Sequence, residues 1–148
     1  MPTYCVSTVK VHDIASIFKA LSSDHALSLL RAIAIERREP DVLRSELKLT
    51  SKQYYSRISA LTKANLIHKK GGFLTLTSFG KLVYESHITI EKGLEDLSKL
   101  KVIDSLEASS DLSKEERDNI INILLQNREI KTVLEKKNSI INNNTNIL

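Results

Sequence analysis

Side chains that donate hydrogen bonds or carry positive charge are concentrated between residues 51 and 70. They form two groups, the second directly ahead of a Gly-Gly pair: Ser51, Lys52, Gln53, Tyr55, Ser56, Arg57, Ser59 and Lys63, then His68, Lys69 and Lys70. Amides and hydroxyls can both donate and accept hydrogen bonds, and lysine and arginine attract anions. The chemistry indicated is the binding of a polar, negatively charged partner.

The charge balance singles out the same region. Residues 41–81 carry 8 Lys or Arg against 2 Asp or Glu, a net charge of +6, whereas residues 1–40 carry +1 and residues 82–148 carry −3. Positive charge concentrated in this way indicates a surface that faces a polyanion. A Lys-rich face that is only solvated is the alternative explanation.

The residue arrangements that catalysis or metal binding would need are missing from the sequence. The histidines are scattered, at His12, His25, His68 and His87, and glycine is scarce. We therefore expect no enzymatic activity, no catalytic residues and no cofactor. Cys5 alone cannot form an internal disulfide. His87 with Glu91 is only half a metal site, and we expect the pair on a solvated face with no metal bound.

Membrane and secretion signals are also missing. No apolar run approaches the roughly 20 residues that a membrane span needs, and the first residues do not form a charged and then apolar secretion signal. We expect a soluble, cytoplasmic protein that has no membrane partner.

Three helices are predicted ahead of the basic segment, over residues 11–21, 22–37 and 41–47, because apolar residues recur in each at helical spacing. Asp13 is available to cap the first helix, and the second ends before Pro40. The residues predicted to face the core are, helix by helix, Ile14, Ile17, Phe18 and Leu21; Leu27, Leu30, Ile33 and Ala34; and Val42, Leu43 and Leu47.

A fourth helix is predicted over residues 51–64, with Thr50 or Ser51 as its cap. Its inward residues recur at i, i+4 and i+7 and are Tyr54, Ile58 and Leu61. This spacing leaves Tyr55 and most other polar side chains on the outer side, with Arg57 at the border. The helix therefore presents a polar, non-acidic surface.

Two short strands should follow, since residues 66–70 and 73–77 alternate apolar and polar side chains around Gly71-Gly72. Asn65 is predicted to end the preceding helix in a left-handed conformation. Thr77 should cap a long helix over residues 78–103, whose apolar residues include Val83, Ile90, Leu94 and Leu97.

The last third of the chain predicts a linker, a helix and a tail. Residues 104–112 are acidic and serine-rich, Ser113 with Glu116 forms a capping box for a helix over 113–137, and residues 138–148 are an Asn-rich tail that we expect to be disordered. The apolar face of this helix must be buried against its own domain or a second subunit, and we favour the second subunit. The residues predicted to form the dimer interface are Val83, Ile90, Leu94, Leu97, Ile120, Leu124 and Ile130.

Three motifs, in this order, resemble the winged helix-turn-helix domain of DNA-binding regulators. FKALSSDHALSLLRAIA is similar to the opening helices of the ArsR-type families, SRISALTKANLI to their recognition helix running into the wing, and LTSFGK to their L-T-x-x-G. The resemblance covers roughly residues 12–100. It implies a mainly α fold with a small β-hairpin wing, here a domain over residues 1–103 with a helical extension. The cysteines of metal-sensing members are absent from VLRSELKL, and Ala26 stands where many relatives have arginine.

The resemblance implies a transcriptional regulator that binds double-stranded DNA as a homodimer. The helix over 51–64 would enter the major groove, and the hairpin over 66–76 would contact the backbone. All residues of the two groups named at the outset are then DNA-binding residues. A protein-interaction adaptor without sequence-specific DNA binding is the alternative, which the +6 segment disfavours. The sequence identifies no small-molecule effector.

Overall fold

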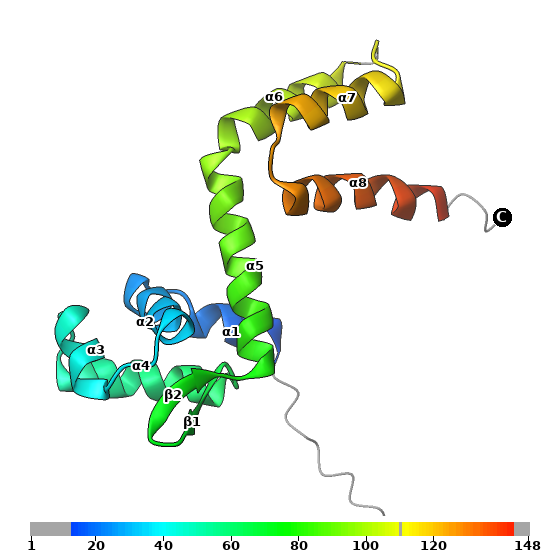
Figure 1. Cartoon of the computed structure of the whole chain (residues 1–148). Helices are drawn as coiled ribbons and strands as arrows, with labels where there is room; N and C mark the ends of the chain where they lie inside the picture. The colour runs from blue at the N-terminus through cyan, green and yellow to red at the C-terminus, as the bar shows by residue number, and fades with distance from the viewer. Residues whose placement is uncertain (1–12, 110, 144–148) are drawn as a thin grey trace, which may run out of the picture. The chain divides into compact units, whose positions relative to one another are not determined.

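The computed structural model describes residues 13–109 and 111–143, and side chains as far as residue 136. The elements follow one another in this order (Figure 1): α1 (Ile14–Ala20), α2 (Asp24–Ile35), α3 (Pro40–Glu46), α4 (Ser51–Lys63), β1 (Ile67–Lys70), β2 (Phe73–Leu76), α5 (Ser78–Glu95), α6 (Leu97–Ala108), α7 (Lys114–Leu124) and α8 (Arg128–Asn143). The predicted fold class, mainly helical with one antiparallel hairpin, is confirmed.

The chain forms two compact units, Met1–Tyr84 and Glu85–Leu148. These units divide the chain within α5, whereas the predicted domain extends to residue 103.

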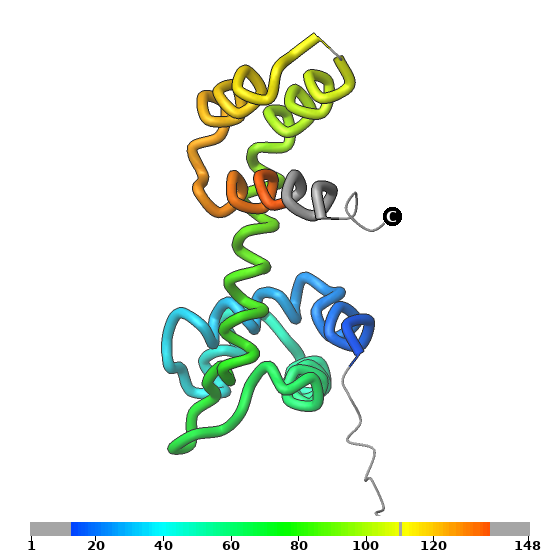
Figure 2. The backbone as a smooth tube through the Cα atoms, turned by 90° about the vertical axis from the view of Figure 1, so that its right-hand side faces the viewer, coloured from blue at the N-terminus to red at the C-terminus, as the bar shows by residue number. Residues whose placement is uncertain are grey.

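The first unit is a winged helix. Figures 1 and 2 show α2, α4 and the hairpin grouped around the first turns of α5. Burial of a leucine or isoleucine side chain stabilises the fold by about 1.5–3 kcal/mol each, and this unit buries many of them together. Its core consists of Ile17, Leu29, Leu30, Ile33, Leu43, Leu49, Tyr54, Leu61, Ala64, Leu66, Ile67 and Leu74.

Capping residues fix where the first helices begin. Asp13 Oδ1 accepts the Ser16 amide at 2.7 Å, and Ser23 Oγ accepts the Ala26 amide at 3.2 Å. Ser23 is therefore the cap of α2. α2 ends at Ile35, two residues before the predicted Arg37, because the chain turns to an extended conformation at Glu36.

Several residues predicted to face this core do not. Ile14 and Phe18 of α1 are 67% and 62% exposed, and Val42 of α3 is 44% exposed. Both helices are only seven residues long, and each buries a single residue, Ile17 or Leu43. In α2 the buried residues are Ala26, Leu29, Leu30 and Ile33, whereas Leu27 and Ala34 are half-buried. The buried stripe of α2 is thus rotated relative to the prediction.

The second unit has a core of its own, made where α6, α7 and α8 meet. It consists of Ile103, Ile121, Leu125 and Ile130, with Leu100, Leu124 and Leu134 packed against them. Ile121, Leu125 and Ile130 of the extension are therefore buried within the same chain, whereas Ile123 and Val133 remain 79% and 62% exposed. Coverage of the remaining apolar surface by a second subunit stays a prediction. Among the described residues, no helix is long and apolar enough to cross a membrane.

The helices of the second unit begin and end differently from the prediction. The predicted helix over 78–103 is interrupted at Asp96, and α6 continues through Ala108, so most of the predicted linker is helical. The predicted helix over 113–137 is two helices. Part of the predicted disordered tail, residues 138–143, belongs to α8, and residues 144–148 lie outside the described part.

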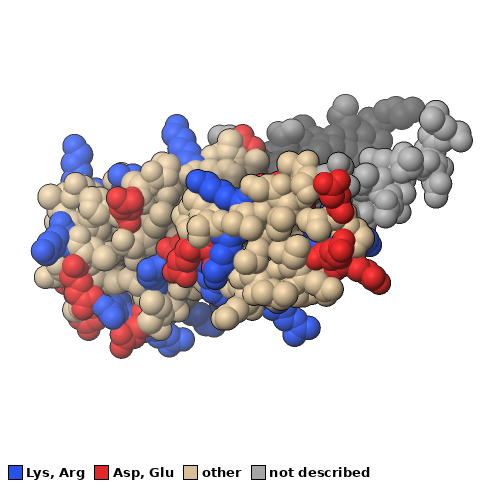
Figure 3. All heavy atoms as spheres, turned by 90° about the horizontal axis from the view of Figure 1, so that it is seen from above, with Lys and Arg blue, Asp and Glu red and all other residues tan. Residues whose placement is uncertain are grey.

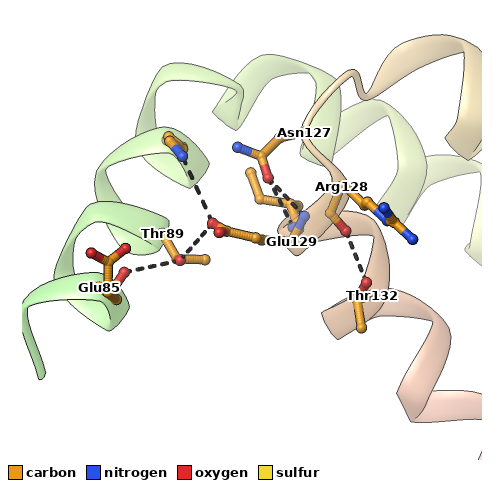
Figure 4. Close-up of polar contacts among 8 residues, drawn as sticks. Glu85, Thr89, Asn127, Arg128, Glu129 and Thr132 are labelled. Carbon is orange, nitrogen blue, oxygen red and sulfur yellow. Dashed lines mark hydrogen bonds and ion pairs between the residues drawn. The ribbon is translucent and has the colours of Figure 1, made fainter. Parts of the chain in front are cut away.

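Asn127 explains the interruption between α7 and α8. Its Oδ1 accepts the amides of Glu129 at 2.9 Å and Ile130 at 3.2 Å, so it caps α8. Glu129 then accepts the Thr89 hydroxyl at 3.1 Å and lies 3.7 Å from Lys92 Nζ, which joins α8 to α5 (Figure 4). At the start of α7 the predicted capping box is present, and the Ser113 amide and hydroxyl lower the pKa of Glu116.

Candidate nucleic-acid interface

A capping box fixes the start of α4. From the sequence, either Thr50 or Ser51 could be the cap. Thr50 is the cap, with its Oγ1 accepting the Gln53 amide at 3.2 Å. In return, Gln53 Oε1 accepts the Thr50 amide at 3.0 Å. Two backbone donors at this helix terminus are thereby satisfied. Gln53, predicted to contact a ligand, thus also has a structural role.

The two sides of α4 are as predicted. Tyr54 and Leu61 are buried, and Ile58 packs against the core. Burial raises the pKa of Tyr54. The ring of Tyr54 contacts that of Tyr55 edge to face, with centroids 5.3 Å apart, while Tyr55 itself is 65% exposed. The predicted binding residues on the outer side are exposed: Ser51, Lys52, Gln53, Tyr55, Ser56, Ser59 and Lys63. Arg57 is half-buried, in agreement with its border position.

The hairpin is confirmed, with a strand pairing that divides its basic residues between two faces. Ile67 pairs with Leu76 and Lys69 with Leu74, so these positions share the face that carries the buried residues. His68 pairs with Thr75 and Lys70 with Phe73 on the opposite face. His68 Nε2 and Thr75 Oγ1 are 3.4 Å apart. Lys70 directly precedes the turn, whereas Lys69 and His68 lie further along β1.

The turn itself needs its glycines. Gly71 and Gly72 have φ angles of 61° and 83°, which glycine adopts without steric cost. Such a two-residue connection matches the twist of the two strands. The tip is therefore short, and Lys70 is held next to it.

A set of hydrogen bonds ties the end of α4 and the hairpin to the start of α5. Asn65 has the predicted left-handed conformation, with φ of 60°. Thr77 Oγ1 donates to the Asn65 carbonyl at 2.6 Å and accepts the Gly80 amide at 2.8 Å. The Thr77 amide donates to the Leu66 carbonyl at 3.0 Å. The recognition-helix candidate and the wing are thereby held in one fixed arrangement.

Sequence reasoning missed Arg44 on α3. Its Nη1 donates to the Ser51 hydroxyl at 2.5 Å, which brings a guanidinium to the first residue of α4. A periodicity search finds helices and cannot detect a side-chain bond across a turn. Arg44 belongs to the segment with a net charge of +6, and this position in the sequence could have indicated it as a candidate binding residue. On the face of the molecule drawn in Figure 3, acidic and basic side chains are mixed among uncharged ones, so this face has no purely basic patch among the described residues.

The other polar pair considered from sequence lies in the second unit. His87 Nε2 is 3.4 Å from Glu91 Oε1, and the His87 side chain is 15% exposed. The Glu91 side chain is 39% exposed, so the predicted solvated position holds for Glu91 and not for His87. Within residues 13–109 and 111–143, no group of three His, Cys, Asp or Glu side chains could hold a metal ion.

The chain is similar to a solved structure of a repressor. The multiple antibiotic-resistance repressor (MarR) from Listeria monocytogenes 4b F2365 shares 16% sequence identity with a TM-score of 0.48, over 82% of this chain and 81% of that chain. No known family model matches this chain, and no curated protein does. A likeness at this level assigns neither a family nor a function to this chain.

Proposed function

We propose that this protein is a transcriptional regulator that binds double-stranded DNA, with α4 in the major groove and the hairpin on the sugar-phosphate backbone. The observation that carries the proposal is the outer side of α4. It is exposed, polar and non-acidic over its whole length, and it belongs to the segment with a net charge of +6. The major groove admits a helix of this kind, and lysines beside it neutralise phosphates.

The DNA-binding residues that we propose fall into two roles. Gln53, Tyr55 and Ser56 lie near the start of α4, where side chains of a recognition helix meet base edges. The remaining residues suit phosphate contacts that position the protein without reading sequence: Ser51, Lys52, Arg57, Ser59, Lys63, His68, Lys69 and Lys70.

The test is binding to DNA as a function of salt. Fluorescence anisotropy with a mixed-sequence duplex should show affinity falling steeply between about 50 and 200 mM salt, with a slope near −0.9 for each phosphate neutralised. Selection of bound sequences from random duplexes would then give the preferred site. No binding at the lower salt concentration would contradict the proposal and favour the protein-interaction adaptor.

The proposal includes a homodimer. Two copies on neighbouring half-sites gain the affinity that a single winged helix lacks. Three of the residues predicted for the interface are exposed: Ile90, Leu94 and Leu97. Ile90 and Leu94 lie four residues apart on α5, and Leu97 is the first residue of α6. The others are used inside the chain or half-buried: Ile130 and Leu124 belong to the second core, Val83 packs against the first, and Ile120 is half-buried.

We propose a winged-helix regulator without assigning it to the ArsR-type subfamily. The motifs that resemble ArsR-type proteins have packing roles in this chain, such as the Thr77 cap and the close approach of Gly80 to Leu66. They support the fold without favouring that subfamily. We propose a regulator that uses no metal and no catalytic step, and whose compartment is the cytoplasm.

A further inference from the structure

Arg44 lies on α3 and bonds across the turn to α4. One guanidinium nitrogen, Nη1, donates to Ser51 Oγ at 2.5 Å, and the other, Nη2, lies 3.7 Å from the Asp41 carboxylate. The Arg44 side chain nevertheless remains 37% exposed. A positive charge is therefore fixed at the solvent boundary beside the first residue of the candidate recognition helix.

The backbone of the turn holds Arg44 in this place. The Leu49 amide donates to the Arg44 carbonyl at 3.0 Å, and the Lys48 amide donates to the Ser45 carbonyl at 3.1 Å. Leu43 and Leu49, on either side of the turn, are buried. Because both the backbone and one end of the guanidinium are already ordered, little conformational freedom is left to lose when a ligand binds.

The bond between Arg44 and Ser51 determines what the serine hydroxyl can do. Since Ser51 Oγ accepts from the guanidinium, its own hydrogen is directed elsewhere and is available for donation. A guanidinium has five N–H groups, so the bond to Ser51 and the ion pair with Asp41 use only part of its capacity. Asp41 is 89% exposed at its side chain, so solvent screens its charge.

We propose that Arg44 and Ser51 together bind one phosphate of the DNA backbone. A phosphate oxygen accepts hydrogen bonds and carries negative charge, which matches two neighbouring donors of which one is a guanidinium. Arg44 supplies the charge and orients the Ser51 hydroxyl. The inference rests on the proposed function, and it extends the DNA interface from α4 and the hairpin to α3.

Arg44→Ala tests the charge contribution. Against a mixed-sequence duplex, affinity should fall about fivefold to tenfold near 0.1 M salt, equally for unrelated sequences, and the salt slope should become smaller in magnitude by about 0.9. Ser51→Ala should weaken binding and leave the slope unchanged, because it removes no charge. Arg117→Ala, which removes the same charge from α7, is the matched control and should change neither quantity.

The double variant tests whether the two residues share one phosphate. In the Arg44→Ala background, Ser51→Ala should have little further effect on affinity, because the hydroxyl has already lost its orienting partner. Independent, additive losses would overturn the shared site. If circular dichroism shows that Arg44→Ala is unfolded, Arg44→Gln removes the charge and keeps an amide donor, and the same slope change is expected.

The failures of the two proposals are distinguishable. A wild-type protein that binds no duplex at low salt contradicts DNA binding itself. A wild-type protein that binds with a steep salt slope, together with a folded Arg44 variant whose slope is unchanged, overturns only the role of Arg44.

Discussion

The side-chain oxygen of Gln53 caps α4 and is also one of the two atoms that would read adenine. A glutamine that reads adenine in the major groove uses its amide oxygen and its amide nitrogen together. Here the oxygen already accepts the Thr50 amide at 3.0 Å. With the cap intact, only the amide nitrogen can face the DNA, as a donor to a base acceptor. Reading adenine with both atoms would require α4 to give up part of its cap.

We predict that Gln53→Ala changes both stability and DNA preference. Loss of a capping interaction typically costs about 0.5–2 kcal/mol, so the midpoint of thermal unfolding should fall. Gln53→Glu keeps an acceptor for the Thr50 amide and should unfold close to wild type, while its carboxylate repels phosphate and changes the selected sequences. Equal unfolding midpoints for wild type and the alanine variant would contradict a structural role for the side chain.

At the scale of elements, the strand pairing of the hairpin distinguishes two adjacent lysines. Lys70 lies on the face with His68, next to the turn, whereas Lys69 lies opposite Leu74 on the other face. We predict that Lys70→Ala weakens binding to all duplexes alike and reduces the magnitude of the salt slope by about 0.9. Lys69→Ala removes a proposed phosphate contact from the other face and should therefore weaken binding less than Lys70→Ala does. Anisotropy titrations at several salt concentrations measure both, and a larger effect at Lys69 would assign the other face to DNA.

Two glycines of α5 should respond in opposite directions to the same substitution. A Cβ at Gly80 would lie 1.9 Å from the Leu66 carbonyl oxygen, whereas a Cβ at Gly93 would meet nothing within 4 Å. Gly80→Ala should therefore destabilise the first unit by about 1–3 kcal/mol or more. Gly93→Ala should stabilise α5 by roughly 1 kcal/mol, since glycine is a poor helix residue.

Chemical denaturation followed by circular dichroism compares the two variants. A Gly80→Ala protein as stable as wild type would mean that α5 can move away from Leu66 without cost. The hydrogen bonds of Thr77 to Asn65 and Gly80 would then not hold the wing and α4 in one arrangement.

The elements that the sequence predicted correctly are those with strong local signals. The 3.6-residue spacing of Tyr54 and Leu61 identified the buried side of α4, and Gly71-Gly72 identified the turn. The incorrect predictions concern helix boundaries and buried faces that depend on contacts with neighbouring elements. The apolar run from Ile120 to Leu134 continues across the interruption before α8, so periodicity alone could not find it. The Asn127 cap was a signal that could have been used.

At the scale of the whole molecule, the chain itself covers part of the apolar surface that a second subunit was expected to cover. Ile103, Ile121, Leu125 and Ile130 are buried among themselves. What remains exposed in the second unit includes Ile90, Leu94 and Leu97, at 60%, 65% and 45%.

We predict that these three residues form the contact between two copies of the chain. Sedimentation equilibrium of the full chain at micromolar concentration should show a dimer, and the double variant Ile90→Asn with Leu94→Asn should be a folded monomer, because the removed side chains are exposed. Ile123→Asn is the matched control, since Ile123 is 79% exposed on α7 and lies off this stripe. Stable interfaces bury about 1,200 Å² or more, so side chains around the stripe must contribute as well. A monomeric wild-type protein would contradict the dimer, and a variant that stays dimeric would place the contact elsewhere on the surface.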